Sequence, residues 1–389
     1  MSAPALDART RTLAALWALG SVMILGLALG DVQDSVGWAI PKHGVVIGRD
    51  FVNMWVGGRM AAEGALAHVY DPLFYLAFLH DLWPAQVQHN YSYPPHTLLL
   101  GLPLSQLSYP AALGVWTVAT GALFYRAAAP FVRGFPAWAA VLTPAAVANV
   151  WDGQYGFLAG ALFLRVFAQM EVRPVRAGLA AGLLTVKPHL GLLLPLVMLV
   201  RRRFAVIAVA ALAATGCVLL SGAMFGFGLW RDFIAKVPPT QAHILAARGH
   251  EFYLLMMPTA RVALRGWPDP LPSIGQLLFA AAALALLWRA RAAPPHELAF
   301  PTATATFLIL PYAFNYDMPV ANLGFAVLLA SRWDSLRRWE IAVLGAGFML
   351  PQLTFVFGVL HLPFAPAILL ACLWVQVRHA TPAGRFSPA

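Results

Sequence analysis

Four short polar segments interrupt a strongly apolar chain, and they hold the residues whose types could do chemistry. Carboxylates accept protons and basic side chains stabilise negative charge, but ionisable groups are costly at membrane depth, so they are functional candidates by default. The four segments are Arg49-Asp50 with Arg59, Asp152-Gly153-Gln154-Tyr155, Lys187-Pro188-His189 and Asn315-Tyr316-Asp317. They lie far apart in the sequence, so the elements between them decide whether they meet.

The composition indicates that most of the chain lies in lipid. Of the 389 residues 60% are apolar and only 11% are charged, against about 25% charged in soluble domains. A soluble domain of this size has too little interior to hide so much apolar surface. The net charge of +10 does not indicate nucleic acid, because the basic residues are spread in small groups between apolar runs.

Twelve apolar segments are candidate membrane-spanning helices, which need roughly 20 residues each. The predicted spans are 12–30, 108–126, 135–150, 156–171, 175–187, 188–200, 204–224, 273–290, 297–313, 317–331, 339–360 and 363–378. The neighbouring segments 175–187 and 188–200 are either two spans or one kinked helix. Residues 95–105 are too few to cross and are predicted to be re-entrant.

The basic residues orient these spans. With the N-terminus on the cytoplasmic side, short inner segments hold most of the 26 Lys and Arg residues, as the positive-inside rule requires. Two longer segments, 31–94 and 225–272, then lie outside, and both chain ends lie inside. We predict an all-α polytopic protein of about 12 spans, with residues 1–389 as one membrane domain. The same alternation places all four polar segments on the outer face.

The residues after Asp50 predict a helix that lies on the membrane. In GRDFVNMWVGGRMAAEG, the side chains of Phe51, Met54 and Trp55 share one helical face with Gly58, a pattern typical of interfacial amphipathic helices. An acid at the start of such a helix has a structural interpretation, because it caps the helix and complements its dipole.

Five motifs occur in order between about residues 48 and 320. They are GRDFVNMWVGGRMAAEGALAHVYDP, SYPPHTLLL, WDGQYGFLAGALF, AGLAAGLLTVKPHLGLLLPLVMLVRRR and LPYAFNYDMPV. In this order they resemble the first outer loop, the Tyr-Pro-Pro segment, the Gly-Gln motif, the Lys-Pro hairpin and the late Tyr-Asp motif of glycosyltransferase family 87. Gly156 stands where the Gly-Gln motif often has Asn, and Asn315-Tyr316 stands where some members carry a His pair.

The resemblance implies a GT-C fold, in which a helical membrane body carries a first outer loop with a catalytic acid. It implies inverting transfer of a hexose, commonly mannose, from a polyprenyl phosphate to a lipid or glycan acceptor. Asp50 would be the general base that takes the acceptor proton. The expected partners are these substrates and membrane lipids, with no cofactor, no metal and no obligate protein partner. Family habit places such an enzyme in a bacterial plasma membrane, with its active face toward the periplasm.

Eight further residues are candidates for substrate binding. Lys187, Arg59 and Arg265 could stabilise the leaving phosphate, and Lys187 has the best motif support. The other candidates are Gln154, Asp152, Tyr316, Asp317 and His189. Structural alternatives stay open: Lys187 as a snorkelling lysine, Asp152 and Asp317 as helix caps or partners of an outer arginine, and His189 as an interfacial residue.

Two other function classes compete with the enzyme. A transporter or lipid flippase usually has inverted repeats and charges at the bilayer midplane, whereas the charges here lie at the outer ends of the predicted spans. A non-catalytic membrane scaffold is the third class, and the clustering of polar motifs on one face argues against it.

Overall fold

The computed structural model describes residues 7–85, 89–247, 249 and 251–380, and in these ranges the protein is helical apart from one small hairpin. The long helices are α1 (Ala8–Gln33), α5 (Tyr109–Ala128), α10 (Phe204–Phe225), α11 (Gly228–Ala246), α14 (Leu271–Arg289) and α17 (Arg338–Val359). The shorter helices are α2 (Phe51–Ala62), α3 (Pro72–Leu82), α4 (Leu98–Leu104), α6 (Pro144–Asp152), α7 (Gly156–Gln169), α8 (Pro174–Leu183), α9 (Leu194–Val200), α12 (Phe252–Leu255), α13 (Ala260–Ala263), α15 (Pro295–Ile309), α16 (Pro319–Arg332) and α18 (Phe364–His379). Strands β1 (Ala39–Ile40) and β2 (Val45–Val46) pair antiparallel.

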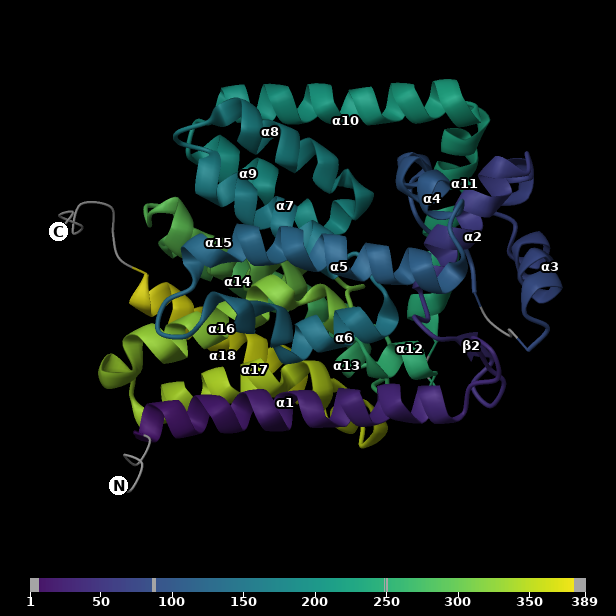
Figure 1. Cartoon of the computed structure of the whole chain (residues 1–389). Helices are drawn as coiled ribbons and strands as arrows, with labels where there is room; N and C mark the ends of the chain where they lie inside the picture. The colour runs from purple at the N-terminus through teal and green to yellow at the C-terminus, as the bar shows by residue number, and fades with distance from the viewer. Residues whose placement is uncertain (1–6, 86–88, 248, 250, 381–389) are drawn as a thin grey trace, which may run out of the picture.

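The long helices give the molecule two distinct ends. Figure 1 shows α1, α5 and α10 crossing the molecule in a similar direction, with the hairpin, α2, α3 and α11 at one end. The start of α1 and the end of α18 lie at the other end. Because Asp50 directly precedes α2, the other polar segments can form a common site with it only if they reach the same end.

Four described helices are long and apolar enough to cross a membrane, namely α1, α10, α14 and α17. A fifth candidate is the pair Pro95–Leu104 and Tyr109–Phe131, which bends by 115°. Several other predicted spans are shorter or interrupted. Segment 135–150, for example, is a 3-10 turn (Ala137–Leu142) followed by α6, because Pro144 has no N–H with which to continue a helix.

The chain around Lys187 folds back as a hairpin. The run Pro174–Val186 ends at Lys187, and a second run begins at Pro188. Glu171, before the first run, pairs with Arg201, after the second, at 2.6 Å, so the two runs are neighbours and Lys187 lies at the tip. This resolves the alternative in favour of two segments.

Helix α2 differs from the expected amphipathic helix. Its first eight residues are all buried, and so is Met60, so it lies inside the protein and not on a lipid surface. Trp55, for example, donates a hydrogen bond to the Leu107 carbonyl at 3.0 Å and packs on the rings of Trp83 and Tyr109. The short helix α4 packs against α2 and helps to bury it. The sequence of residues 50–64 alone cannot predict this contact.

The two segments predicted as outer loops contact each other. The ring of Tyr70, from segment 31–94, lies 5.8 Å from that of Phe233 in α11. Helix α11 also packs near the start of the Tyr-Pro-Pro segment, where Trp230 stacks on His96 with ring centroids 5.7 Å apart. Segments 31–94 and 225–272 therefore pack together at the end of the molecule that holds α2.

Candidate functional site

Asp50 precedes α2 but does not cap it. Its side chain accepts no hydrogen bond from the first turn of the helix, unlike Asp71, which accepts from the backbone N–H groups of Leu73 and Phe74 at the start of α3. The Asp50 carboxylate faces other parts of the chain and stays 32% exposed. The capping interpretation is therefore wrong for Asp50, and the carboxylate is open to a substrate on one side.

Three side chains from distant segments hold this carboxylate. Oδ2 of Asp50 accepts from Nε2 of Gln154 at 2.6 Å and from the Tyr316 hydroxyl at 3.2 Å. Oδ1 lies 3.6 Å from Nε2 of His89. Burial raises the pKa of Asp50, but the nearby imidazole of His89 and the amide of Gln154 outweigh it and leave the pKa below its usual value. Asp50 is thus ionised at neutral pH.

The end of α6 positions Gln154. Gly153 ends the helix in the left-handed region at φ 60°, and a Cβ there would lie 2.5 Å from Cβ of Phe51, so only glycine fits without strain. Nε2 of Gln154 also donates to the Tyr93 hydroxyl at 3.0 Å, while its Oε1 accepts from the Tyr155 N–H. These bonds fix which end of the amide faces Asp50.

Lys187 and Asp317 form a buried ion pair beside Asp50. Nζ of Lys187 lies 2.5 Å from Oδ1 of Asp317, and both side chains are almost fully buried. Lys187 is therefore not a snorkelling lysine, and Asp317 pairs with a lysine, not an arginine. Nε2 of His189 lies 3.9 Å from Oδ2 of Asp317. The Tyr316 ring, 4.8 Å from the Lys187 ammonium, connects this pair to Asp50.

Gly156 allows the 3-10 turn Asn315–Asp317 to approach α7. A Cβ at position 156 would lie 2.3 Å from the carbonyl oxygen of Tyr316, so a larger side chain would push the turn away from the site. The family motif often has Asn at this position. In this chain the glycine leaves room for close packing against the turn that carries Tyr316 and Asp317.

Asp152 is buried next to this cluster and is only 2% exposed. Its Oδ2 has no hydrogen-bond partner. Burial raises the pKa of Asp152 well above the usual value, and the nearby charges of Asp50 and Asp31 raise it further. Burial therefore favours the protonated form of the Asp152 carboxyl over the ionised form.

Two predicted phosphate ligands lie elsewhere. Arg59 pairs with Glu63 at 2.7 Å, one turn further along α2. The Arg265 guanidinium donates to the backbone carbonyls of Gly249, Val262 and Gly358, so it fastens three segments together. The structure does not bring either arginine into the cluster around Asp50.

Sequence analysis singled out Arg49 but missed Asp31 and Trp151, its partners next to Asp50. Arg49 makes two hydrogen bonds to the buried Asp31 at the end of α1, at 2.9 and 3.0 Å. Trp151 donates to the same carboxylate at 2.8 Å, and the guanidinium of Arg49 lies 4.2 Å from its ring. Asp31 is an acid at the end of an apolar run, and this signal could have marked it. His89, four residues before Tyr93, was missed as well.

Within the described ranges, no group of three or more His, Cys, Asp and Glu side chains is arranged as a metal site. We therefore assign no metal ligands. The cluster offers the Asp50 carboxylate, which can accept a proton, the Asp152 carboxyl, whose protonated form is favoured by burial, and the buried Lys187 ammonium, which can stabilise an anion.

Comparison with known families decides the class of protein. Residues 91–311 match the family model of glycosyltransferase family 87, which covers more than half of the chain. The chain belongs to glycosyltransferase family 87. Neither a curated protein nor a solved structure matches it. As a family 87 member it is a glycosyltransferase that uses a sugar donor and an acceptor. The matched stretch contains Gln154, Lys187 and His189.

Proposed function

We propose that this protein transfers a hexose from a polyprenyl phosphate to a hydroxyl group of a lipid or glycan, with inversion at the anomeric carbon. Mannose is the hexose that the family resemblance implies. The observation that carries the proposal is the set of contacts around Asp50. An ionised, partly exposed carboxylate that caps no helix is held by Gln154 and Tyr316 next to a buried ammonium group.

Asp50 is the general base of this proposal. It takes the proton of the acceptor hydroxyl while the acceptor oxygen attacks the anomeric carbon. The bond between that carbon and the phosphate oxygen breaks on the opposite face, and the polyprenyl phosphate leaves with the electron pair. A single displacement of this kind inverts the anomeric centre and needs one base, as in inverting glycosidases.

Lys187 is the proposed partner of the leaving phosphate. A buried ammonium stabilises charge that develops on a phosphate better than an exposed one does, because water does not screen it. Asp317 holds this ammonium in position, and His189 lies beside the other oxygen of Asp317. Asp152, in its protonated form, is proposed to donate a hydrogen bond to a substrate oxygen. Arg59 and Arg265 have no role in the proposal, because their contacts are with Glu63 and with backbone carbonyls and not with the cluster around Asp50.

We also propose a GT-C-type arrangement of about twelve membrane segments, with both chain ends in the cytoplasm and segments 31–94 and 225–272 outside. Helices shorter than 18 residues would cross only as members of a packed bundle or as pairs. The distribution of basic residues supports this topology, as does the meeting of all four polar segments at one end. A bacterial plasma membrane with the site facing the periplasm follows from the family habit.

Radiolabelled sugar transfer tests the function. Purified protein is given polyprenyl phosphates that carry mannose or glucose, together with a membrane lipid extract as acceptor. We expect label to move from a lipid-linked donor and not from the corresponding nucleotide sugar. Transfer from the nucleotide sugar alone would contradict the proposed donor. Folded protein that uses neither donor would contradict the proposal as a whole.

A further inference from the structure

A cavity with charged side chains in its walls lies at the opposite end of the molecule from Asp50. It has a volume of about 80 Å³, several times what a single water molecule needs. Its walls come from the start of α15, the ends of α16 and α18, and residues 130–133. Helix α15 has 15 residues, so it separates this cavity from the turn that carries Asp317 by roughly 20 Å at 1.5 Å per residue.

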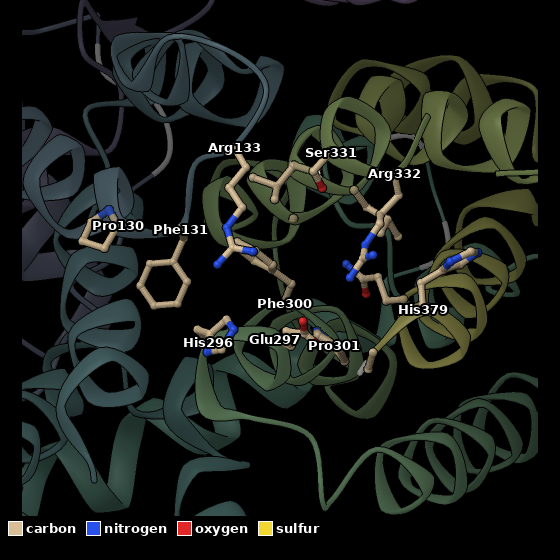
Figure 2. A pocket seen from close by; sticks show the side chains of 15 residues that line it. Pro130, Phe131, Arg133, His296, Glu297, Phe300, Pro301, Ser331, Arg332 and His379 are labelled. Atoms are coloured by element: carbon tan, nitrogen blue, oxygen red, sulfur yellow. Dashed lines mark hydrogen bonds between the residues drawn. The ribbon is translucent and has the colours of Figure 1, made fainter. Parts of the chain in front are cut away.

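Two arginines converge on this cavity. Figure 2 shows the guanidinium groups of Arg133 and Arg332 pointing into the space between them, one from the loop before α6 and one from the end of α16. A single carboxylate, Glu297, lies on the opposite wall. The first turn of α15 adds the positive end of a helix dipole. The cavity is therefore suited to an anion.

An unpartnered amide lies in the same wall. Gln376 is only 5% exposed, and neither its Nε2 nor its Oε1 has a hydrogen-bond partner. A buried amide without partners costs free energy unless a ligand or water satisfies it. Its N–H₂ group can donate to a phosphate oxygen, and its oxygen can accept from a hydroxyl group. Gln376 thus indicates a ligand independently of the arginines.

The remaining lining contains His296, Ser331 and His379 and is otherwise apolar. Phe131, Phe300, Val327 and Leu328 form a wall below the arginines, on helices that belong to the membrane body. Such a wall would be unfavourable beside a free phosphate ion but fits hydrocarbon chains. We propose that this cavity binds the phosphate head of an anionic membrane lipid, with Arg133 and Arg332 on its oxygens, Gln376 beside them and the lipid chains along the apolar wall.

Titration of the full-length protein in a neutral detergent tests this. The probes are dioctanoyl phosphatidic acid, inorganic phosphate and dioctanoylglycerol, and the readout is the saturable rise in Tm. We expect saturation with phosphatidic acid alone, and an apparent Kd about tenfold weaker in Arg133→Gln, since one charge-assisted hydrogen bond is lost. The double variant Arg133→Gln/Arg332→Gln is expected to be weaker still.

The matched control is Arg173→Gln/Arg176→Gln. These two arginines precede and begin α8, are exposed, and are expected on the same side of the membrane, so the control loses the same charge away from the cavity. Equal loss of binding in both double variants would overturn the proposal and leave Arg133 as an orientation signal only. Saturation by inorganic phosphate at similar concentration would overturn the lipid as ligand. Because Arg133 is exposed, its single substitution tests the site even if the double variant misfolds.

Discussion

Asp50 and Gln154 meet at 2.6 Å between Oδ2 and Nε2, although 104 positions separate them in the chain. This contact takes the place of the helix cap that Asp50 could have formed with α2. The oxygens of a capping acid would accept hydrogen bonds from backbone N–H groups. Here side chains hold the carboxylate, which stays partly exposed.

Asp50→Asn should separate catalysis from stability. Because Asp50 caps nothing, the variant should fold with a Tm close to that of the wild type. Its amide cannot take a proton, so sugar transfer should fall by roughly 10² to 10⁴, the usual contribution of a positioned base. The control is Asp71→Asn, at a real cap, where Asn caps about as well as Asp and both transfer and Tm should persist. Near wild-type transfer by Asp50→Asn would remove Asp50 from the mechanism.

Lys187→Ala should lose stability as well as donor use. It leaves Asp317 buried without its cation, which costs about 3–5 kcal/mol. Lys187→Met with Asp317→Asn removes both charges, so it should recover most of the stability but not the KM for the lipid-linked donor. Lys187→Arg keeps the charge with different geometry and should be intermediate. Normal donor KM in a stable double variant would show that the ammonium does not bind phosphate.

Asp152→Asn should change how stability depends on pH. The pKa of Asp152 is raised in the folded protein, so folding favours the protonated acid, while the unfolded chain ionises above about pH 4. Wild-type stability should therefore fall as pH rises from about 4 toward the folded-state pKa. Asn cannot ionise, so Tm of the variant should exceed that of the wild type at pH 8 and converge with it near pH 4. A difference that does not vary with pH would indicate an ionised Asp152.

Asp31→Asn should destabilise the segment that carries Asp50. The substitution leaves the Arg49 guanidinium buried without its counter-ion, at a cost of about 3–5 kcal/mol. Asp34, three residues on, pairs with the exposed Lys42, so Asp34→Asn should change the free energy of unfolding by less than about 1 kcal/mol. Chemical denaturation followed by tryptophan fluorescence measures both. Equal effects would mean that the Asp31 pair is no more than a surface contact.

Cysteine labelling in intact cells should report the proposed topology. Leu73 is 82% exposed in segment 31–94, and Arg202 is exposed in a short connection that we expect inside. With Cys217 and Cys372 replaced, an impermeant maleimide should label Leu73→Cys but not Arg202→Cys. Permeabilised cells provide the control, since both should then react. The reverse pattern in intact cells would invert the orientation.

The sequence was sufficient for the helical class and for much of the cluster. Composition indicates lipid, and the motifs that contain Gln154, Lys187 and Tyr316 do meet near Asp50. The sequence was insufficient where a residue's burial or partner depends on a segment far away in the chain. The periodicity of α2 cannot show that α4 covers its second face, and nothing local distinguishes Lys187, which enters the site, from Arg59, which pairs within its own helix. Asp31 was overlooked because its partners Arg49 and Trp151 come from other segments, which the sequence around residue 31 does not show.

The stretch that identifies the family, residues 91–311, holds only half of each key pair. Gln154 and Lys187 lie inside it, and their carboxylate partners Asp50 and Asp317 lie outside. A chimaera that grafts this stretch onto foreign ends would keep the glutamine and the lysine hairpin but contain neither acid. With Asp50 and Asp317 in the proposed roles, such a chimaera would still match the family model but would lack both carboxylates, so we expect it to transfer no sugar.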